Sequence, residues 1–146
     1  MGFRFRFETL SRVRKIREDL ALQEFSKAQK KLQDLEGMKA DKLSQRMHKV
    51  LDLMLKMEAG IPARDVKSYT HYIAFLEDEV ERIDRLIAQA RKLLDEKREE
   101  LLKAKQEHKA MDRLREIDLE RYIQEQSRQE MQFIDEIAIM RHGRRV

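Results

Sequence analysis

The sequence predicts an all-α protein: a long antiparallel two-helix coiled-coil hairpin whose second helix is longer than the first. Three observations carry this prediction. Apolar residues recur at steps of three and four from Val66 to Met111, the spacing of a helix that packs along a partner helix. Gly60-Ile61-Pro62 is the strongest turn signal in the middle of the chain. Charged residues make up 41% of the chain and aromatic residues 6%, so the apolar residues can form only a narrow stripe.

The expected organisation is a single coiled-coil domain over residues 1–146. Helix one should span about residues 9–59, the turn residues 60–62, and helix two about residues 63–141. A helix cannot continue through this turn, because its proline lacks a backbone donor and clashes with the preceding helical turn. The glycine that opens the turn can adopt the left-handed conformation that ends a helix.

The apolar residues of helix one form two heptad runs, separated by a gap of eight residues between Leu35 and Leu43. Gly37 lies in this gap, and it should weaken the helix by about 1 kcal/mol without ending it. We expect a one-residue skip there, so that both runs face helix two. The first run is Ala21, Phe25, Ala28, Leu32 and Leu35, and the second is Leu43, Met47, Val50, Met54 and Met57.

Helix two carries the longest regular seam of the chain, that is, the row of residues expected to face the other helix. Every seam residue is apolar except Lys97 and His108. We interpret His108 as a polar residue that sets the register. In an antiparallel hairpin with this turn, the numbers of two facing residues add up to about 123, so Val50 should face Ile73. The seam consists of Val66, Tyr69, Ile73, Leu76, Val80, Ile83, Ile87, Ala90, Leu94, Lys97, Leu101, Ala104, His108 and Met111.

The seam of helix two loses its regularity beyond Met111, where Arg115 and Asp118 take the next seam positions. Helix one, whose N-terminal end faces this part of helix two, should reach no further than Met111 and its neighbours. About 25 residues of helix two are then left without a partner. This tail must bind another protein, self-associate or stay partly exposed, and we favour another protein. Heptad spacing returns in it at Ile123, Ser127, Glu130, Ile134, Ile137 and Arg141, and Phe133, Ala138 and Met140 widen the apolar face.

The net charge of +4 is distributed unevenly along the chain. Residues 1–17 hold six basic side chains and one acidic side chain, and residues 141–146 hold three arginines and no acid. The residues between them hold 23 basic and 27 acidic side chains. Basic ends can bind an acidic partner, but the acidic centre would repel a phosphate backbone. We therefore expect no nucleic-acid partner.

Several classes of protein are disfavoured by what the sequence lacks. No stretch approaches the roughly 20 apolar residues that cross a bilayer, so we expect no direct membrane insertion and a cytoplasmic location. The start of the chain does not have the pattern of a secretory signal. The chain has no cysteine, and its four histidines do not have the spacing of metal ligands. We expect a protein that is not an enzyme and that uses no cofactor and no metal.

Two groups of aromatic residues suggest contact surfaces. Tyr72 and Phe75 lie beside the seam of helix two, near the turn, and should point away from helix one. Single exposed apolar residues are normal, but clustered aromatics are typical of a docking patch. Phe3, Phe5 and Phe7 alternate with arginines, as in a short strand or an extended arm. They could stack on nucleic acid, but we favour docking on helix two at the open end of the hairpin.

Three stretches of the sequence resemble the FliJ family of flagellar type III export proteins. The opening of the chain is similar to the opening of that family, with FRFRFETL at residues 3–10. The start of helix two is similar as well, with YTHYIAFLE at residues 69–77 directly after a Gly-x-Pro turn. The third stretch begins with QE at residues 129–130, continues with DEIA at residues 135–138 and ends at Arg141. The resemblance extends over the whole chain in the same order and spacing.

The resemblance implies an antiparallel coiled coil similar to the stalk part of the rotary ATP synthase gamma subunit. It also implies a soluble component of the flagellar export apparatus, peripheral to the inner membrane at the flagellar base. Its partners would be the export ATPase hexamer, the transmembrane export gate protein and export chaperones. The implied gate contact consists of Tyr72, Phe75, Leu76, Glu79 and Ile83. The implied contact with the ATPase ring consists of Arg4, Arg6, Arg12, Arg14, Ile134, Asp135, Glu136 and Arg141.

Two other functions stay open at the level of the sequence. The chain could be a generic coiled-coil adaptor or a structural protein that homodimerises through its tail, which sedimentation would show as a dimer. It could also bind nucleic acid or an anionic membrane surface through its basic ends, which would give a steep dependence of binding on salt.

Overall fold

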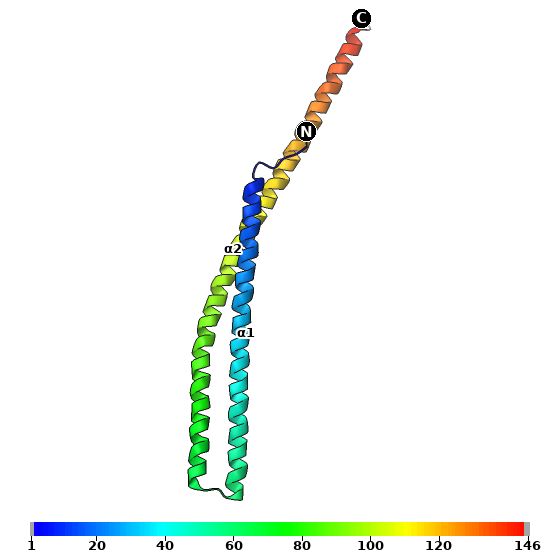
Figure 1. The fold of residues 1–146 in the computed structure, drawn as a ribbon. Helices are drawn as coiled ribbons and strands as arrows, with labels where there is room; N and C mark the ends of the chain where they lie inside the picture. Colours follow the sequence, from blue (N-terminus) through cyan, green and yellow to red (C-terminus); the bar gives the residue numbers. More distant parts are fainter. Residues whose placement is uncertain (1, 145–146) are drawn as a thin grey trace. The chain divides into compact units, whose positions relative to one another are not determined.

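The computed structural model describes residues 2–144 and consists of two helices joined by a short turn (Figure 1). Helix α1 spans Glu8–Ala59 and helix α2 spans Ala63–Arg144. These bounds confirm the predicted all-α hairpin with a longer second helix. Arg145, which belongs to the basic C-terminal end of the sequence, lies outside the described residues.

The turn between the helices forms for the reasons that the sequence predicts. Gly60 has a φ of 83°, a left-handed conformation that other residues rarely adopt, and its N–H donates to the carbonyl of Met57 at 3.2 Å. Pro62 directly precedes α2, at a place where its missing donor is not needed. Its carbonyl accepts the first bonds of α2, from the N–H groups of Asp65 at 3.0 Å and Val66 at 3.3 Å.

The chain divides into two compact units, to which both helices contribute. The first, here called the turn unit, is Ala21–Leu101 and contains the turn. The second, here called the end unit, joins the N-terminal residues up to Leu20 to the residues from Leu102 onward.

The core of the turn unit lies along the predicted seam of α2. Ile83 is fully buried and packs with Leu35 of α1, and Leu76 is 1% exposed. The ion pairs between the helices confirm the predicted register, since Lys39 pairs with Asp84 and Arg46 pairs with Glu77. The buried seam residues of this unit are Leu76, Ile83, Ile87, Ala90, Leu94 and Leu101.

The predicted skip in the seam of α1 is wrong. Heptad spacing continues from Leu35 without a break. The next seam positions are all half-buried, although the first four are basic residues. They are Lys39, Lys42, Arg46, Lys49 and Leu53. The apolar run expected in their place is mostly exposed, with 43% for Leu43, 65% for Met47, 56% for Met54 and 54% for Met57, whereas Val50 is half-buried.

The basic residues of this seam are tolerated because their side chains are amphipathic. Their methylene stems cover the seam of α2 while the charged ends reach its polar groups. Lys39 Nζ lies 2.7 Å from a carboxylate oxygen of Asp84, and Arg46 lies 2.8 Å from one of Glu77. Lys49 Nζ lies over the ring of Tyr69, 5.2 Å from its centroid. Counting apolar residues alone therefore assigned the wrong face of α1 to the interior.

In the end unit, the N-terminal arm docks on α2, as favoured from the sequence. Residues 2–5 have no regular structure, and Phe5 is 7% exposed. Its ring meets that of Phe7 at 5.8 Å, and the guanidinium of Arg115 lies 5.2 Å from its centroid. Phe3 packs against Tyr122, with ring centroids 5.6 Å apart. The arm thus covers α2 beyond the level at which α1 begins.

Candidate partner-binding surfaces

Tyr72 and Phe75 form an exposed aromatic pair on α2 in the turn unit. Their rings are stacked with centroids 6.3 Å apart, and the residues are 40% and 52% exposed. Lys49 Nζ lies 5.3 Å from the centroid of Tyr72. An open cavity of about 330 Å³ lies beside this ring, and a partner side chain could occupy it. Its lining is Gln45, His48, Lys49, Asp52 and Tyr72.

The polar groups next to this pair link the two helices through one hydroxyl. Tyr69 donates a hydrogen bond to a carboxylate oxygen of Asp52 at 2.8 Å and accepts one from Lys56. The bond from Tyr69 holds the pKa of Asp52 below its ordinary value, and the charge of Lys56 acts in the same direction. The pKa of Lys56 is raised, first by its bond to Tyr69 and then by the charge of Asp52.

The predicted gate residues do not form one surface. Glu79 is half-buried and accepts a hydrogen bond from Arg82 at 2.9 Å, which lowers the pKa of Glu79; the charge of Lys42 lowers it further. Leu76 and Ile83 are buried between the helices, so a partner cannot touch them while the hairpin is closed. We define the aromatic surface as Tyr72, Phe75 and Glu79.

Most of the predicted basic residues of the end unit are engaged by carboxylates of the chain itself. Arg6 pairs with Asp118 at 3.3 Å, Arg12 with Glu8 at 3.8 Å, and Arg14 with Glu107 at 2.6 Å. The Nε atom of Arg14 is buried and has no hydrogen-bond partner. Arg4 is exposed and has no ion pair within residues 2–144, and an open cavity of about 340 Å³ lies between it and Arg115.

His108 also faces a carboxylate of the other helix. Its Nδ1 lies 2.5 Å from a carboxylate oxygen of Glu18, and its Nε2 lies 3.7 Å from Asp112. Sequence reasoning placed His108 in the seam but missed both Glu18 and Glu107 as partners across the helices. The antiparallel register was a signal that could have found them, because the numbers of both pairs add up to nearly 123.

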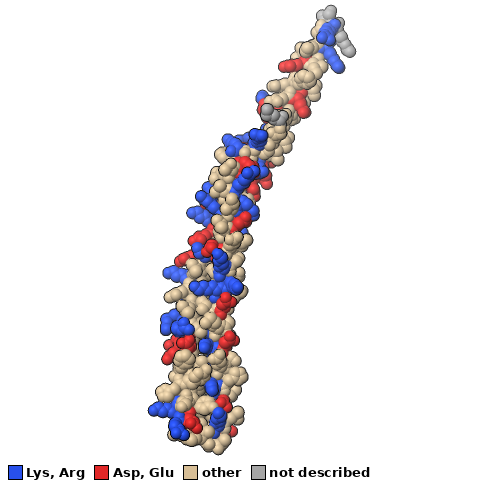
Figure 2. All heavy atoms as spheres, in the orientation of Figure 1, with Lys and Arg blue, Asp and Glu red and all other residues tan. Residues whose placement is uncertain are grey.

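The tail of α2 beyond Tyr122 is exposed except for Ile137, which is half-buried. Ile134 is 59% exposed, and Asp135, Glu136 and Arg141 are exposed without an ion pair in the part of the chain that the structure describes. On the face drawn in Figure 2, acidic and basic side chains are interspersed with uncharged atoms. We define the tail surface by its large exposed apolar side chains, Ile123, Met131, Phe133, Ile134, Ile139 and Met140.

Neither helix, within residues 2–144, contains an apolar stretch long enough to span a bilayer. No group of three or more histidine, aspartate or glutamate side chains in that range is placed to hold a metal ion.

Comparisons with known proteins bear on the family and on the fold. The family profile described as "Flagellar FliJ protein" matches residues 3–146. A flagellar FliJ protein of Bacillus subtilis (strain 168) is 20% identical over 139 residues, which cover 95% of each chain. The structure of a YscO homologue, CT670, from Chlamydia trachomatis has a TM-score of 0.66 at 21% identity, covers 97% of this chain and 96% of its own, and so supports the fold. The profile match over nearly the whole length shows that this chain belongs to the flagellar FliJ protein family.

Proposed function

We propose that this chain is a stalk and adaptor of the flagellar type III export apparatus. It acts in the cytoplasm at the flagellar base, peripheral to the inner membrane, and it is not an enzyme. Its partners are the export ATPase hexamer, the transmembrane export gate protein and export chaperones. Catalysis belongs to the ATPase, and the chain changes the rate of that catalysis by binding.

The observation that carries this proposal is the exposed tail of α2. An apolar helix face of this length is unfavourable in water unless a partner covers it. The tail also presents Asp135, Glu136 and Arg141 free of ion pairs among the described residues, so these side chains can pair with a partner without first losing a bond. Arg4 is the cation of the predicted basic set that is likewise unpaired within residues 2–144.

The experiment is a titration of the purified export ATPase with the full chain, with ATP turnover as the measurement. We expect no turnover by the chain alone and faster turnover by the ATPase in its presence. Ile134→Asp should abolish the increase, because it places a charge in the tail surface. The matched control is Phe75→Ala, which lies in the aromatic surface and should keep the increase. Unchanged turnover at saturating chain would rule out the stalk function.

A second candidate function is homodimerisation through the tail surface, which the same exposed apolar side chains favour. Sedimentation equilibrium distinguishes the two. A monomer at micromolar concentration supports the stalk, whereas a dimer that Ile134→Asp dissociates supports a self-associating structural protein.

A further inference from the structure

We propose that α1 carries a docking groove for a basic amphipathic helix of another protein, separate from the aromatic surface and from the tail. We call it the α1 groove and define it by Ala40, Leu43, Met47 and Met54 of α1 with Glu81 and Ala88 of α2. The proposal concerns residues of the turn unit alone and does not depend on the stalk function.

The apolar stripe of α1 is the first observation. Leu43, Met47 and Met54 are 43%, 65% and 56% exposed, and Leu51 beside them is 51% exposed. Single exposed apolar side chains are ordinary, but four on one stretch of helix form a continuous patch. They are spaced three and four residues apart, which is the spacing at which the apolar face of a second helix can pack against them. Two of the four are methionines, whose flexible side chains adapt to a partner.

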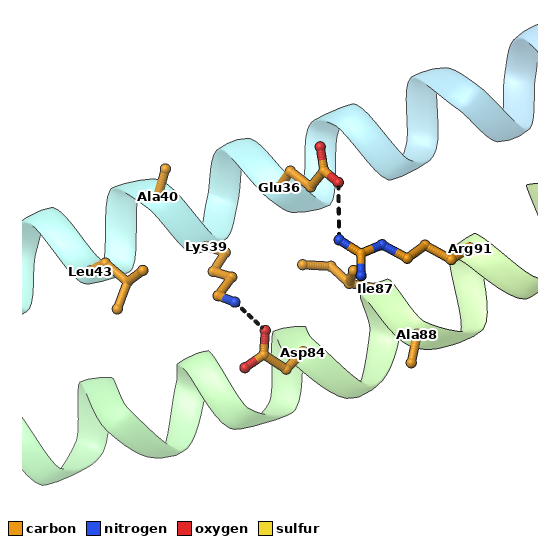
Figure 3. A pocket seen from close by; sticks show the side chains of 8 residues that line it. All are labelled: Glu36, Lys39, Ala40, Leu43, Asp84, Ile87, Ala88 and Arg91. Carbon is orange, nitrogen blue, oxygen red and sulfur yellow. Dashed lines mark ion pairs between the residues drawn. The ribbon is translucent and has the colours of Figure 1, made fainter.

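A cavity beside Leu43 is the second observation. It has a volume of about 460 Å³ and is lined by residues of both helices, among them Ala40 and Ala88, whose small side chains point away from the facing helix in Figure 3. Ile87 and Leu43 contribute apolar walls. Four lining residues form two ion pairs between the helices, Lys39 with Asp84 at 2.7 Å and Glu36 with Arg91 at 3.6 Å. Such a hole accepts one large apolar side chain, as holes between helices do in a bundle.

The charge beside the groove selects the partner. Glu77, Glu81 and Asp84 recur at steps of four and three, so these carboxylates share the face of α2 that borders the groove. Glu77 and Asp84 are paired with Arg46 and Lys39. Glu81 is exposed and has no ion pair among the described residues. A lysine or arginine next to the apolar seam of the partner helix would therefore meet a free carboxylate.

The α1 groove and the aromatic surface lie on opposite sides of the α1 seam. Tyr72 shares its cavity with Gln45 and His48, whereas the α1 groove contains Ala40 and Leu43. The groove positions 40, 43 and 47 each directly follow a seam position of α1 (39, 42 and 46). The positions beside Tyr72, 45 and 48, each directly precede a seam position (46 and 49). Each residue turns the direction of the side chain by about 100° around the helix axis. The groove residues and the residues beside Tyr72 therefore point to different sides of the seam.

One competing explanation makes a different prediction. If α1 were rotated by one residue beyond Gly37, Leu43, Met47 and Met54 would be buried against α2 and would replace the basic residues there. The stripe would then belong to the core, and no docking surface would exist. Substitution of Met47 separates the two, because a charge strongly destabilises a core and has little effect on the stability of a surface.

The binding experiment uses the full chain and a labelled synthetic peptide, three copies of the heptad Leu-Lys-Ala-Leu-Lys-Lys-Ala, with fluorescence anisotropy as the readout. We expect Met47→Asp to weaken binding by about tenfold or more, because the α1 groove loses its central apolar contact. Glu81→Gln should weaken it by about two- to fivefold, as expected for one exposed ion pair. The matched control is Leu20→Asp, also on α1 and 55% exposed but in the end unit, which should bind like the original chain.

Four results would overturn the proposal. The first is no binding of the peptide to the original chain. The second is equal loss of affinity in Met47→Asp and Leu20→Asp. The third is equal binding of a peptide in which every lysine is replaced by glutamate. The fourth is a fall in the melting temperature of Met47→Asp as large as that of a core substitution such as Ile83→Asp, which would place the stripe in the core.

Discussion

At the scale of single residues, polar side chains of the seam find partners across the hairpin. Tyr69 bridges Asp52 and Lys56, His108 meets Glu18, and the basic seam of α1 reaches the acids of α2. Each of these groups would be costly between the helices without its partner. The identities of the partners depend on which face of α1 turns inward, which the apolar pattern predicted incorrectly beyond Leu35.

Replacing Tyr69 by Phe tests the bridge near the turn. The hydroxyl that lowers the pKa of Asp52 is then absent, so that pKa should rise toward its ordinary value of 3.8. In the original chain, the pKa of Asp52 is lower in the folded state than in the unfolded state. The ionised carboxylate therefore stabilises the fold at pH values above its ordinary pKa, and this stabilisation is lost as the pH falls through the lowered pKa. Carboxyl ¹³C NMR titration measures the change.

Glu125 serves as the internal control in the same titration. Its pKa is lowered by the hydrogen bond from Arg128 in the end unit, and it should be the same in both proteins. A Tyr69→Phe protein in which the pKa of Asp52 did not move would contradict the bridge.

Replacing both Tyr72 and Phe75 by Ala tests the aromatic surface. Because both side chains are 40% or more exposed, the melting temperature should change little. Binding to the cytoplasmic part of the export gate protein should weaken by about tenfold or more, because exposed aromatic side chains are typical anchors of an interface. Calorimetric titration measures the affinity. A large loss of stability with unchanged affinity would show that the pair belongs to the core.

At the scale of elements, the two helices differ in how far the sequence predicts them. The turn follows from Gly60 and Pro62, and the seam of α2 follows from apolar spacing, because α2 has no competing apolar face there. In α1, two neighbouring faces compete beyond Leu35. The face with the higher hydrophobicity, which contains Met47 and Met54, is outside. Apolar content cannot account for the stems and ion pairs of lysine and arginine, so that choice was not predictable from periodicity.

The seam of α2 can be tested with one substitution at two positions of the same helix. Ile83→Ala should lower the free energy of unfolding by about 2–5 kcal/mol, because Ile83 is fully buried. Ile134→Ala, at a site that is 59% exposed, should change it by less than about 0.5 kcal/mol. Urea denaturation followed by circular dichroism measures both. Similar effects at the two positions would be incompatible with the observed pairing.

Substitution of two glycines by alanine should have opposite effects on stability. Gly37 lies within α1, and a methyl group there would meet nothing within 4 Å, so Gly37→Ala should stabilise the chain by about 1 kcal/mol. Gly60 has a φ of 83°, so Gly60→Ala should destabilise it by about 1–2 kcal/mol. Urea denaturation of the two variants gives both values. A destabilising Gly37→Ala would indicate that the residues around Gly37 do not form a regular helix in solution.

At the scale of the whole molecule, the fold and the family are established, and the partners are proposed. The predicted all-α hairpin with the longer second helix is confirmed, and so is the family that three stretches of the sequence resembled. The contact sites were harder to predict, because binding surfaces consist of exposed side chains that the fold does not require. Leu76 and Ile83 illustrate this, since the family resemblance grouped them with Tyr72 as a contact site, whereas they are buried in the seam that their spacing predicts.

Hydrogen exchange of the full chain, alone and with the export ATPase, tests the central claim most directly. The account predicts slow amide exchange from Leu76 to Leu101 and fast exchange from Ile123 to Arg144 in the free chain, because only the first segment is packed against α1. Adding the ATPase should slow exchange in the tail and leave the aromatic surface unchanged. Equal exchange of the two segments in the free chain, or a tail whose exchange is unaffected by the ATPase, would contradict the account.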